Sequence, residues 1–138
     1  MDRAIIAGSR GFYDYELLKK VADKCIGDDA TDVEVISGTA MGADRLGEQY
    51  AKERGFKVKR FYPNWTRHGK AAGYIRNLEM ARYASQNKSY VPMLLAFWDG
   101  KSNGTRHMIN IAKNRNINTH VIKYNTNEYG DITEVEHV

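Results

Sequence analysis

The stretch Ser37-Gly38-Thr39-Ala40-Met41-Gly42-Ala43-Asp44 decides the fold of this 138-residue chain. It follows the short apolar run Val33–Ser37 and precedes residues 42–54, whose apolar side chains recur at helical spacing. A glycine-rich turn between a buried strand and a helix brings backbone N–H groups and the positive end of the helix close to a ligand. We therefore predict a phosphate-binding turn on a small α/β sheet.

Strand-like and helix-like segments alternate along most of the chain. Strands are predicted at 3–8, Val33–Ser37, Lys57–Tyr62, Val91–Trp98 and Thr119–Tyr124, and helices at Asp14–Ile26, 42–54, Gly73–Ala84 and Asn103–Arg115. This alternation is typical of an open parallel sheet with helices on both faces. We expect an α/β fold: one three-layer domain at 1–125 with a mainly parallel five- to six-stranded sheet. Residues 126–138 are expected to form a polar C-terminal tail or a short edge strand.

Composition and charge narrow the classes of function. No apolar run approaches the roughly 18 residues that span a bilayer, so we expect no membrane partner. The single cysteine, Cys25, cannot form an internal disulfide, and the N-terminus lacks a signal-peptide pattern, so we expect a cytoplasmic location. The net charge of +4 suits anionic partners, although it also fits an ordinary solvated surface. Nucleic acid is a less favoured partner, because no basic run marks a nucleic-acid arm.

Three predicted strands end in loops rich in glycine and hydroxyl side chains. Open parallel sheets bind ligands at these carboxyl ends, where the loops lead into helix N-termini. The loops are Gly8-Ser9-Arg10-Gly11, the Ser37-to-Asp44 turn, and Asp99-Gly100-Lys101-Ser102-Asn103-Gly104-Thr105. None matches a Walker A sequence, and no G-x-G-x-x-G follows the first strand, which disfavours conventional ATPases and dehydrogenases. Three such loops together favour a ligand site over plain strand-to-helix connections.

Two charged side chains extend this candidate site. Arg76 is predicted in the first turn of a helix, where a cation opposes the dipole, so it suggests an anionic ligand. Asp44 either caps N–H groups of its own helix or binds a ribose hydroxyl. An aromatic ring at Trp65 could stack on a base, whereas Trp98 is expected to pack in the core. The candidate ligand-binding residues are Ser9, Arg10, Ser37, Gly38, Thr39, Met41, Gly42, Asp44, Arg76, Asn77, Asp99, Gly104 and Thr105.

Catalytic and metal-binding residues are not apparent in the sequence. The four histidines and Cys25 lack the spacing of a structural zinc site, so we expect no metal. No G-x-S-x-G elbow or convincing nucleophile–base pair is present, so catalytic residues stay unassigned. We expect no required cofactor beyond a nucleotide-type ligand.

Five segments resemble the SLOG superfamily, a Rossmann-like group that includes Smf-type DNA-processing proteins and the LOG phosphoribohydrolases. They are Gly8-Ser9-Arg10-Gly11-Phe12, Ser37 through Leu46, Tyr62-Pro63-Asn64-Trp65, Gly69 through Asn77, and Ala96 through Gly100 with Gly104-Thr105. The chain is most similar to the small YspA/YpsA-related branch. The resemblance implies a Rossmann-like nucleotide-binding domain, a pocket lined by the loops chosen above, and association of copies into a homo-oligomer.

One departure from the LOG pattern bears on catalysis. LOG enzymes cleave an N-glycosidic bond with an arginine and with the glutamate of a G-G-x-G-T-x-x-E motif. Arg76 fits the arginine, but the glutamate position falls on Met108, and Lys101-Ser102 stands in place of the first two glycines. A thioether cannot act as a base. Whether the protein is an enzyme therefore stays open.

The leading hypothesis is a protein that senses or sequesters a nucleotide or a nucleotide-derived signal. The first alternative is a LOG-like hydrolase, in which Glu48 or Glu79 could in principle replace the missing glutamate. A DNA-binding module is the second. A stand-alone binder of this size also suits a sponge that depletes a signalling nucleotide in phage or bacterial defence.

Overall fold

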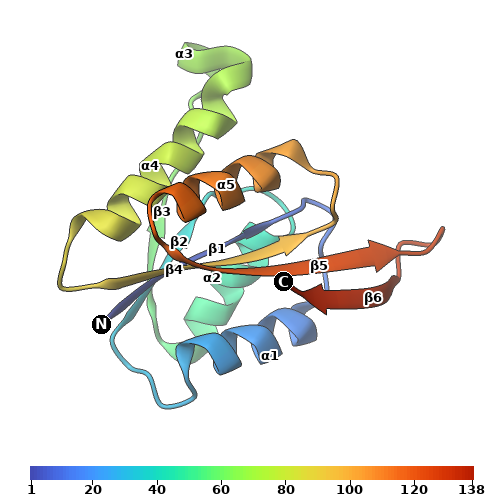
Figure 1. The fold of residues 1–138 in the computed structure, drawn as a ribbon, viewed down its shortest axis with the longest axis horizontal. Coiled ribbons are helices and arrows are strands. Elements are labelled where there is room, and N and C mark those ends of the chain that lie inside the picture. The colour runs from blue at the N-terminus through green and yellow to red at the C-terminus, as the bar shows by residue number, and fades with distance from the viewer.

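The computed structural model describes residues 1–138 as one six-stranded sheet covered by helices on both faces (Figure 1). The strands are β1 (Asp2–Gly8), β2 (Val33–Ser37), β3 (Lys57–Arg60), β4 (Val91–Trp98), β5 (Asn118–Thr126) and β6 (Ile132–His137). The helices are α1 (Tyr15–Ile26), α2 (Ala43–Arg54), α3 (Trp65–His68), the 3-10 turn η1 (Gly69–Ala71), α4 (Ala72–Gln86) and α5 (Asn103–Asn114). The predicted α/β, three-layer, mainly parallel architecture is confirmed.

The strand order is β3-β2-β1-β4-β5-β6, and every pair is parallel except β5 with β6. The chain winds outward from β1 in one direction through β2 and β3, and in the other through β4 and β5. The loops after β1 and β4 therefore lead to opposite faces of the sheet and leave a crevice between them. The last residues pair with β5 as the antiparallel edge strand β6.

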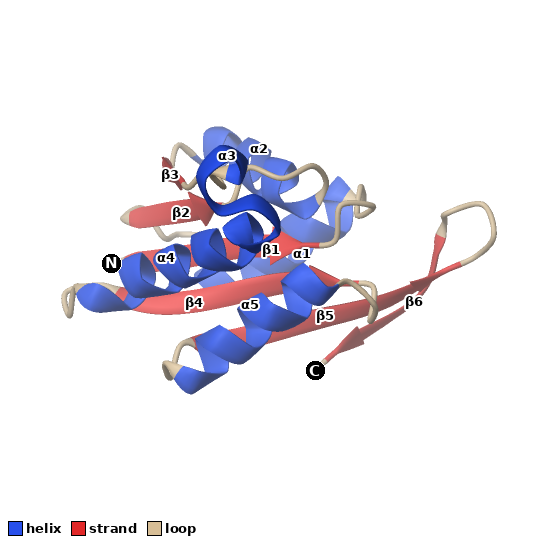
Figure 2. Cartoon of the chain, turned by 90° about the horizontal axis from the view of Figure 1, so that it is seen from above, coloured by secondary structure: helices blue, strands red, loops and turns tan.

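Alternate residues of β1 face the two layers of helices. Ala4 and Ile6 pack with α1 and α2, while Ile5 and Ala7 pack with α4 and α5. All four side chains are buried, which explains why β1 reads as a continuous apolar run rather than an alternating one. Figure 2 shows α4 and α5 lying along one face of the sheet.

The segment before α4 differs from the prediction. Residues 65–71 form α3 and η1 where the sequence suggested a loop, because the Asn64 side chain accepts a hydrogen bond from Arg67 N–H and caps a short helix. The chain then continues into α4 at Ala72, so Arg76 lies beyond the first turn.

The buried face of α4 agrees only in part with the helical pattern of the sequence. Met80 and Ala81 face inward as the pattern indicates, together with Asn77 and Ala84, whereas Ile75 and Leu78 are only partly buried. Small alanine side chains let α4 approach the sheet closely, while Asn77 bonds to α5. Several other boundaries moved by one or two residues; among them, β3 ends at Arg60, β5 extends to Thr126 and α5 ends at Asn114.

Candidate functional site

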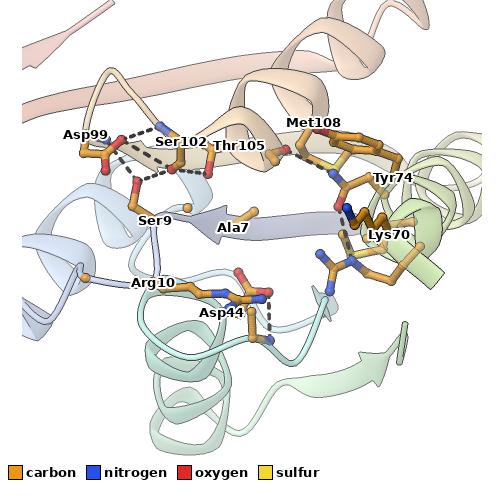
Figure 3. A pocket seen from close by; sticks show the side chains of 18 of the residues that line it. Ala7, Ser9, Arg10, Asp44, Lys70, Tyr74, Asp99, Ser102, Thr105 and Met108 are labelled. Carbon is orange, nitrogen blue, oxygen red and sulfur yellow. Dashed lines mark hydrogen bonds between the residues drawn. The ribbon is translucent and has the colours of Figure 1, made fainter. Parts of the chain in front are cut away.

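A cavity of about 470 Å³, the main cavity, lies at the carboxyl ends of β1 and β4. Its walls come from the loops after these strands, from the start of α2, and from α4 and α5 (Figure 3). This position is the crevice that the strand order creates. The volume falls within the range of small-molecule sites.

Hydroxyl groups gather at one end of the main cavity. Ser9 Oγ lies 2.9 Å from Ser102 Oγ, and Ser102 Oγ lies 3.5 Å from Thr105 Oγ1. The Asp99 carboxylate holds this loop in place, because it accepts hydrogen bonds from the backbone N–H groups of Lys101 and Ser102, each at 2.8 Å. Burial acts to raise the pKa of Asp99, but these hydrogen bonds outweigh it and lower the pKa. Figure 3 shows the hydroxyl groups side by side in front of β1.

The same end of the cavity receives the N-terminus of α5. Gly104 and Thr105 lie in its first turn, and their backbone N–H groups have no acceptor within the protein. An anion placed there would accept from these groups and interact favourably with the helix dipole. Neutral hydroxyl groups beside a helix N-terminus therefore form a suitable phosphate site.

Asp44 enters the cavity from the first turn of α2 and is only 3% exposed. Its Oδ2 accepts a hydrogen bond from Ala40 N–H at 3.2 Å. Burial raises the pKa of Asp44 to about 6, although the positive charge of Arg76 and the Ala40 N–H act in the opposite direction. A buried carboxyl group that titrates near neutrality can either bind a hydroxyl or exchange a proton.

Arg76 reaches into the cavity from α4 and has no carboxylate within 4.0 Å. Its Nη1 donates to Gly38 O at 2.5 Å and its Nε donates to Asn77 Oδ1 at 3.2 Å. The Nη2 group donates to no acceptor of the protein. Burial lowers the pKa of Arg76, which the Asp44 charge only partly opposes. The guanidinium therefore carries an incompletely paired charge in a partly buried position.

Two more cations, Arg10 and Lys70, line the main cavity from its rim. Both side chains are exposed, and neither forms an ion pair within the chain. Asn77 fixes the opposite wall, because its Nδ2 donates to Gly104 O at 3.1 Å and lies 3.3 Å from His107 Nδ1. The wall is thus held by hydrogen bonds where α4 meets α5, whereas the two cations of the rim are exposed.

The structure brings eight of the thirteen candidate residues to the main cavity. They are Ser9, Arg10, Asp44, Arg76, Asn77, Asp99, Gly104 and Thr105. Two others, Gly38 and Thr39, line a smaller cavity beside it.

The remaining three candidates line neither cavity. Ser37 is buried and donates to Glu48 Oε2 at 2.6 Å. Met41 is exposed at the surface. Gly42 starts α2 with a φ of 82°, and a side chain there would lie 2.5 Å from the carbonyl oxygens of the β1–α1 loop. Ser37 and Gly42 thus shape the turn, and they do not face the cavity.

Sequence reasoning did not select several residues that the structure places in the wall. They are Ala40, Gly73, Tyr74, Met80 and Ser102. Ser102 shares a loop with Thr105, so the signal was present there. Tyr74 lies in the predicted helix, but the sequence pattern did not indicate that its side chain would line the cavity. Trp65 also lies in the wall, whereas Trp98 packs against the core and donates from Nε1 to Ser102 O.

Met108 lies in the cavity wall at the position where LOG enzymes carry a glutamate, and it is 1% exposed. Helix α5 contains no aspartate or glutamate. No group of three or more metal-ligating side chains occurs in residues 1–138. No helix of the chain has both the length and the apolar character needed to cross a bilayer.

Comparisons with known proteins agree with the architecture. The family model described as "YspA, cpYpsA-related SLOG family" matches residues 3–68, which include the loops after β1 and β2. The Gene 61 protein of Mycobacterium phage D29 is 32% identical over 122 residues, which cover 85% of this chain and 93% of that protein.

Proposed function

The chain belongs to the YspA, cpYpsA-related SLOG family, and on that premise we propose that it binds a nucleotide or a nucleotide-derived signal in the main cavity. The observation that carries this proposal is the arrangement of unsatisfied groups around one crevice. Arg10, Lys70 and Arg76 offer cationic donors without carboxylate partners, opposite the N-terminus of α5. Such a set complements a phosphate group.

The rest of the cavity suits the other parts of a nucleotide. The Asp44 carboxyl group can accept from a ribose hydroxyl. Tyr74 and Trp65 present aromatic surfaces at 44% and 51% exposure, on which a base can stack. We therefore propose that the phosphate lies near α5 and Arg76, with the nucleoside extending toward α4.

Two measurements test this proposal. Mass spectrometry of small molecules released from the denatured protein identifies any ligand that copurifies, and calorimetry with a panel of nucleotides measures affinity. We expect Arg76→Met to weaken binding roughly tenfold or more, because charge-assisted hydrogen bonds to the phosphate are lost. Arg82→Met is the matched control, since Arg82 lies exposed on the same helix and has no partner. Absence of binding to every nucleotide at millimolar concentration would refute the proposal.

A second candidate function, hydrolysis of the N-glycosidic bond of a nucleotide, is favoured by one observation. Asp44 is the only carboxyl group of the cavity whose pKa is raised toward neutrality. In this reaction the oxygen of water bonds to C1′ as the C1′–N bond breaks, and the base leaves with a proton. Asp44 could exchange that proton, whereas Met108 cannot.

Chromatography of the products distinguishes the two functions. Hydrolysis predicts free base over multiple turnovers, and its loss in Asp44→Asn with nucleotide binding retained. Activity that survives in both Asp44→Asn and Arg76→Met would place the reaction elsewhere. If nucleotide binds but no base is released, sensing or sequestration stands.

The phage relative supports the sequestration proposal, because a phage protein that binds a nucleotide signal would deplete that signal in the host. We further propose, from the family resemblance, that copies of the chain associate, which light scattering measures directly.

A further inference from the structure

A second cavity of about 310 Å³, the side cavity, adjoins the main one. Four residues line both cavities, so the two spaces adjoin along a shared wall. These residues are Arg10, Ala40, Trp65 and Arg76. Gly38, Thr39, Tyr62 and Pro63 complete the side cavity.

The shared wall carries two cations, because Arg10 and Arg76 line both cavities and neither has a carboxylate within 4.0 Å. Burial lowers the pKa of Arg76, the Asp44 charge opposes this, and the positive charge of Arg10 lowers the pKa further. An anionic group between the two guanidinium groups would offset their positive charges and accept from the free Nη2 of Arg76.

The outer wall of the side cavity is aromatic. Tyr62 is 70% exposed and Trp65 is 51% exposed, and Pro63 lies between them in the sequence. The Asn64 cap holds α3, and α3 in turn presents Trp65 to both cavities. Aromatic rings beside a cationic wall are the combination that binds a base next to a phosphate.

The floor of the side cavity carries two backbone features that only a constrained turn provides. A side chain at Gly38 would lie 2.8 Å from Asp44 Oδ2 and 3.0 Å from Arg76 Cζ, so glycine is needed for Arg76 to fold over the turn. Thr39 has a φ of 67°, which is strained for a β-branched residue. Strain of this kind persists where the surrounding structure enforces it, often at ligand sites.

We propose that the ligand has two ring systems joined through a phosphate-containing bridge, as in a dinucleotide or a nucleotide conjugate. The bridge lies between Arg10 and Arg76, the first nucleoside occupies the main cavity, and the second ring stacks against Tyr62 and Trp65. This inference rests on the proposed function. It adds the side cavity, which a mononucleotide in the main cavity leaves unfilled.

Three probes test the proposal by calorimetry: AMP, ADP-ribose and diadenosine diphosphate. The last two share the pyrophosphate bridge and differ by the second adenine. We expect diadenosine diphosphate to bind wild-type protein about fivefold or more tightly than ADP-ribose, because stacking of one base contributes at least about that factor. Diadenosine diphosphate has two equivalent ends, which raise its affinity by about a twofold statistical factor. Only a preference above that factor indicates stacking of the second base.

Tyr62→Ala is the decisive variant, since its exposed side chain can be removed without opening the core. We expect it to lower the preference for diadenosine diphosphate over ADP-ribose toward the twofold statistical factor, with only Trp65 left to stack on the second ring, while binding of AMP is unchanged. Tyr129→Ala is the matched control, because Tyr129 is 81% exposed in the turn between β5 and β6. That variant should retain the wild-type preference.

Each other outcome overturns the proposal in a distinct way. Equal affinities of the wild-type protein for ADP-ribose and diadenosine diphosphate exclude a site for a second ring, while the proposed nucleotide binding stands. A preference that is unchanged in Tyr62→Ala places the second ring elsewhere. Loss of self-association in Tyr62→Ala without a change in preference assigns the aromatic wall to a subunit interface. If no probe binds, the proposed function fails as well.

Discussion

Arg3 and Arg76 lie at opposite ends of the sheet, and their surroundings differ. Arg3, near the start of β1, donates from Nε to Glu34 at 3.1 Å and from Nη1 to Tyr83 O at 2.8 Å. Its guanidinium carbon also lies 4.0 Å from the ring centre of Tyr83 and 4.1 Å from that of Tyr90. Arg76, at the carboxyl end, donates only to two neutral oxygens and has no carboxylate within 4.0 Å.

This difference separates an arginine that stabilises the fold from one that is available to a ligand. At the amino end of the sheet, the Arg3 charge is paired with Glu34 and the guanidinium lies against two aromatic rings. At the carboxyl end, cationic groups and helix N–H groups face a cavity without partners. The same residue type thus supports stability at one end and recognition at the other.

The largest effect on stability is expected from Arg3→Met. It leaves the Glu34 carboxylate, whose side chain is 18% exposed, without its cation. We expect the free energy of unfolding to fall by about 3 kcal/mol, because breaking a largely buried ion pair leaves an uncompensated charge. Denaturant unfolding measures the change, with Arg82→Met as the control. A loss below about 1 kcal/mol would show that the amino-end cluster does not stabilise the fold.

Replacement of Asp44 tests the raised pKa of this buried carboxyl group through the pH dependence of stability. The folded protein keeps the Asp44 proton up to pH about 6, whereas the ordinary value is 3.8. As pH rises through this window the unfolded chain has already released the proton, so stability falls, by about 3 kcal/mol for two units. Asp44→Asn should remove this fall. The free energy of unfolding of the variant should therefore rise relative to that of the wild-type protein between pH 3 and pH 7. A parallel pH dependence of the two proteins would contradict the raised pKa.

Arg76→Met is expected to alter stability less than Arg3→Met. At pH 5, where Asp44 is protonated, we expect a change within about 1 kcal/mol, because only hydrogen bonds to neutral oxygens are lost. Since the Arg76 charge lowers the pKa of Asp44, its removal should also move the pH-dependent loss of stability to higher pH. Unfolding curves from pH 4 to pH 8 measure both effects. A loss as large as that of Arg3→Met would remove the distinction between the two arginines.

The smallest effect is expected from Thr39→Gly. Glycine accepts the positive φ of 67° without strain, so we expect the free energy of unfolding to rise by about 1 kcal/mol. Asn116→Gly is the control, because Asn116 has a similar φ of 58° but asparagine tolerates it. Thermal unfolding of both variants checks the comparison, and equal shifts would show that Thr39 is not strained.

Local patterns predicted the sheet because the apolar runs that form β1 and β4 are short and bounded by glycine. They also predicted the site at the strand ends, since topology dictates where such loops converge. They did not predict the contact between Arg76 and Gly38, which joins residues 38 positions apart and depends on the Gly38 turn lying beneath α4.

The errors in the site have physical causes. The loop before α4 contains Pro63, which favoured a coil interpretation, but the Asn64 cap supports a short helix that brings Trp65 to the cavities. The Ser37-to-Asp44 turn was treated as one ligand-contacting unit. In the structure Ser37 turns to Glu48 and Gly42 packs against the β1–α1 loop, so only part of the turn faces a cavity.

The most direct test of the central claim compares AMP with adenosine on the wild-type protein by calorimetry. If the carboxyl end of the sheet recognises a phosphate through Arg76 and the N-terminus of α5, AMP should bind at least about tenfold more tightly than adenosine. Equal affinity for the two compounds would contradict the account, because the unpaired groups of the cavity would then play no part in binding.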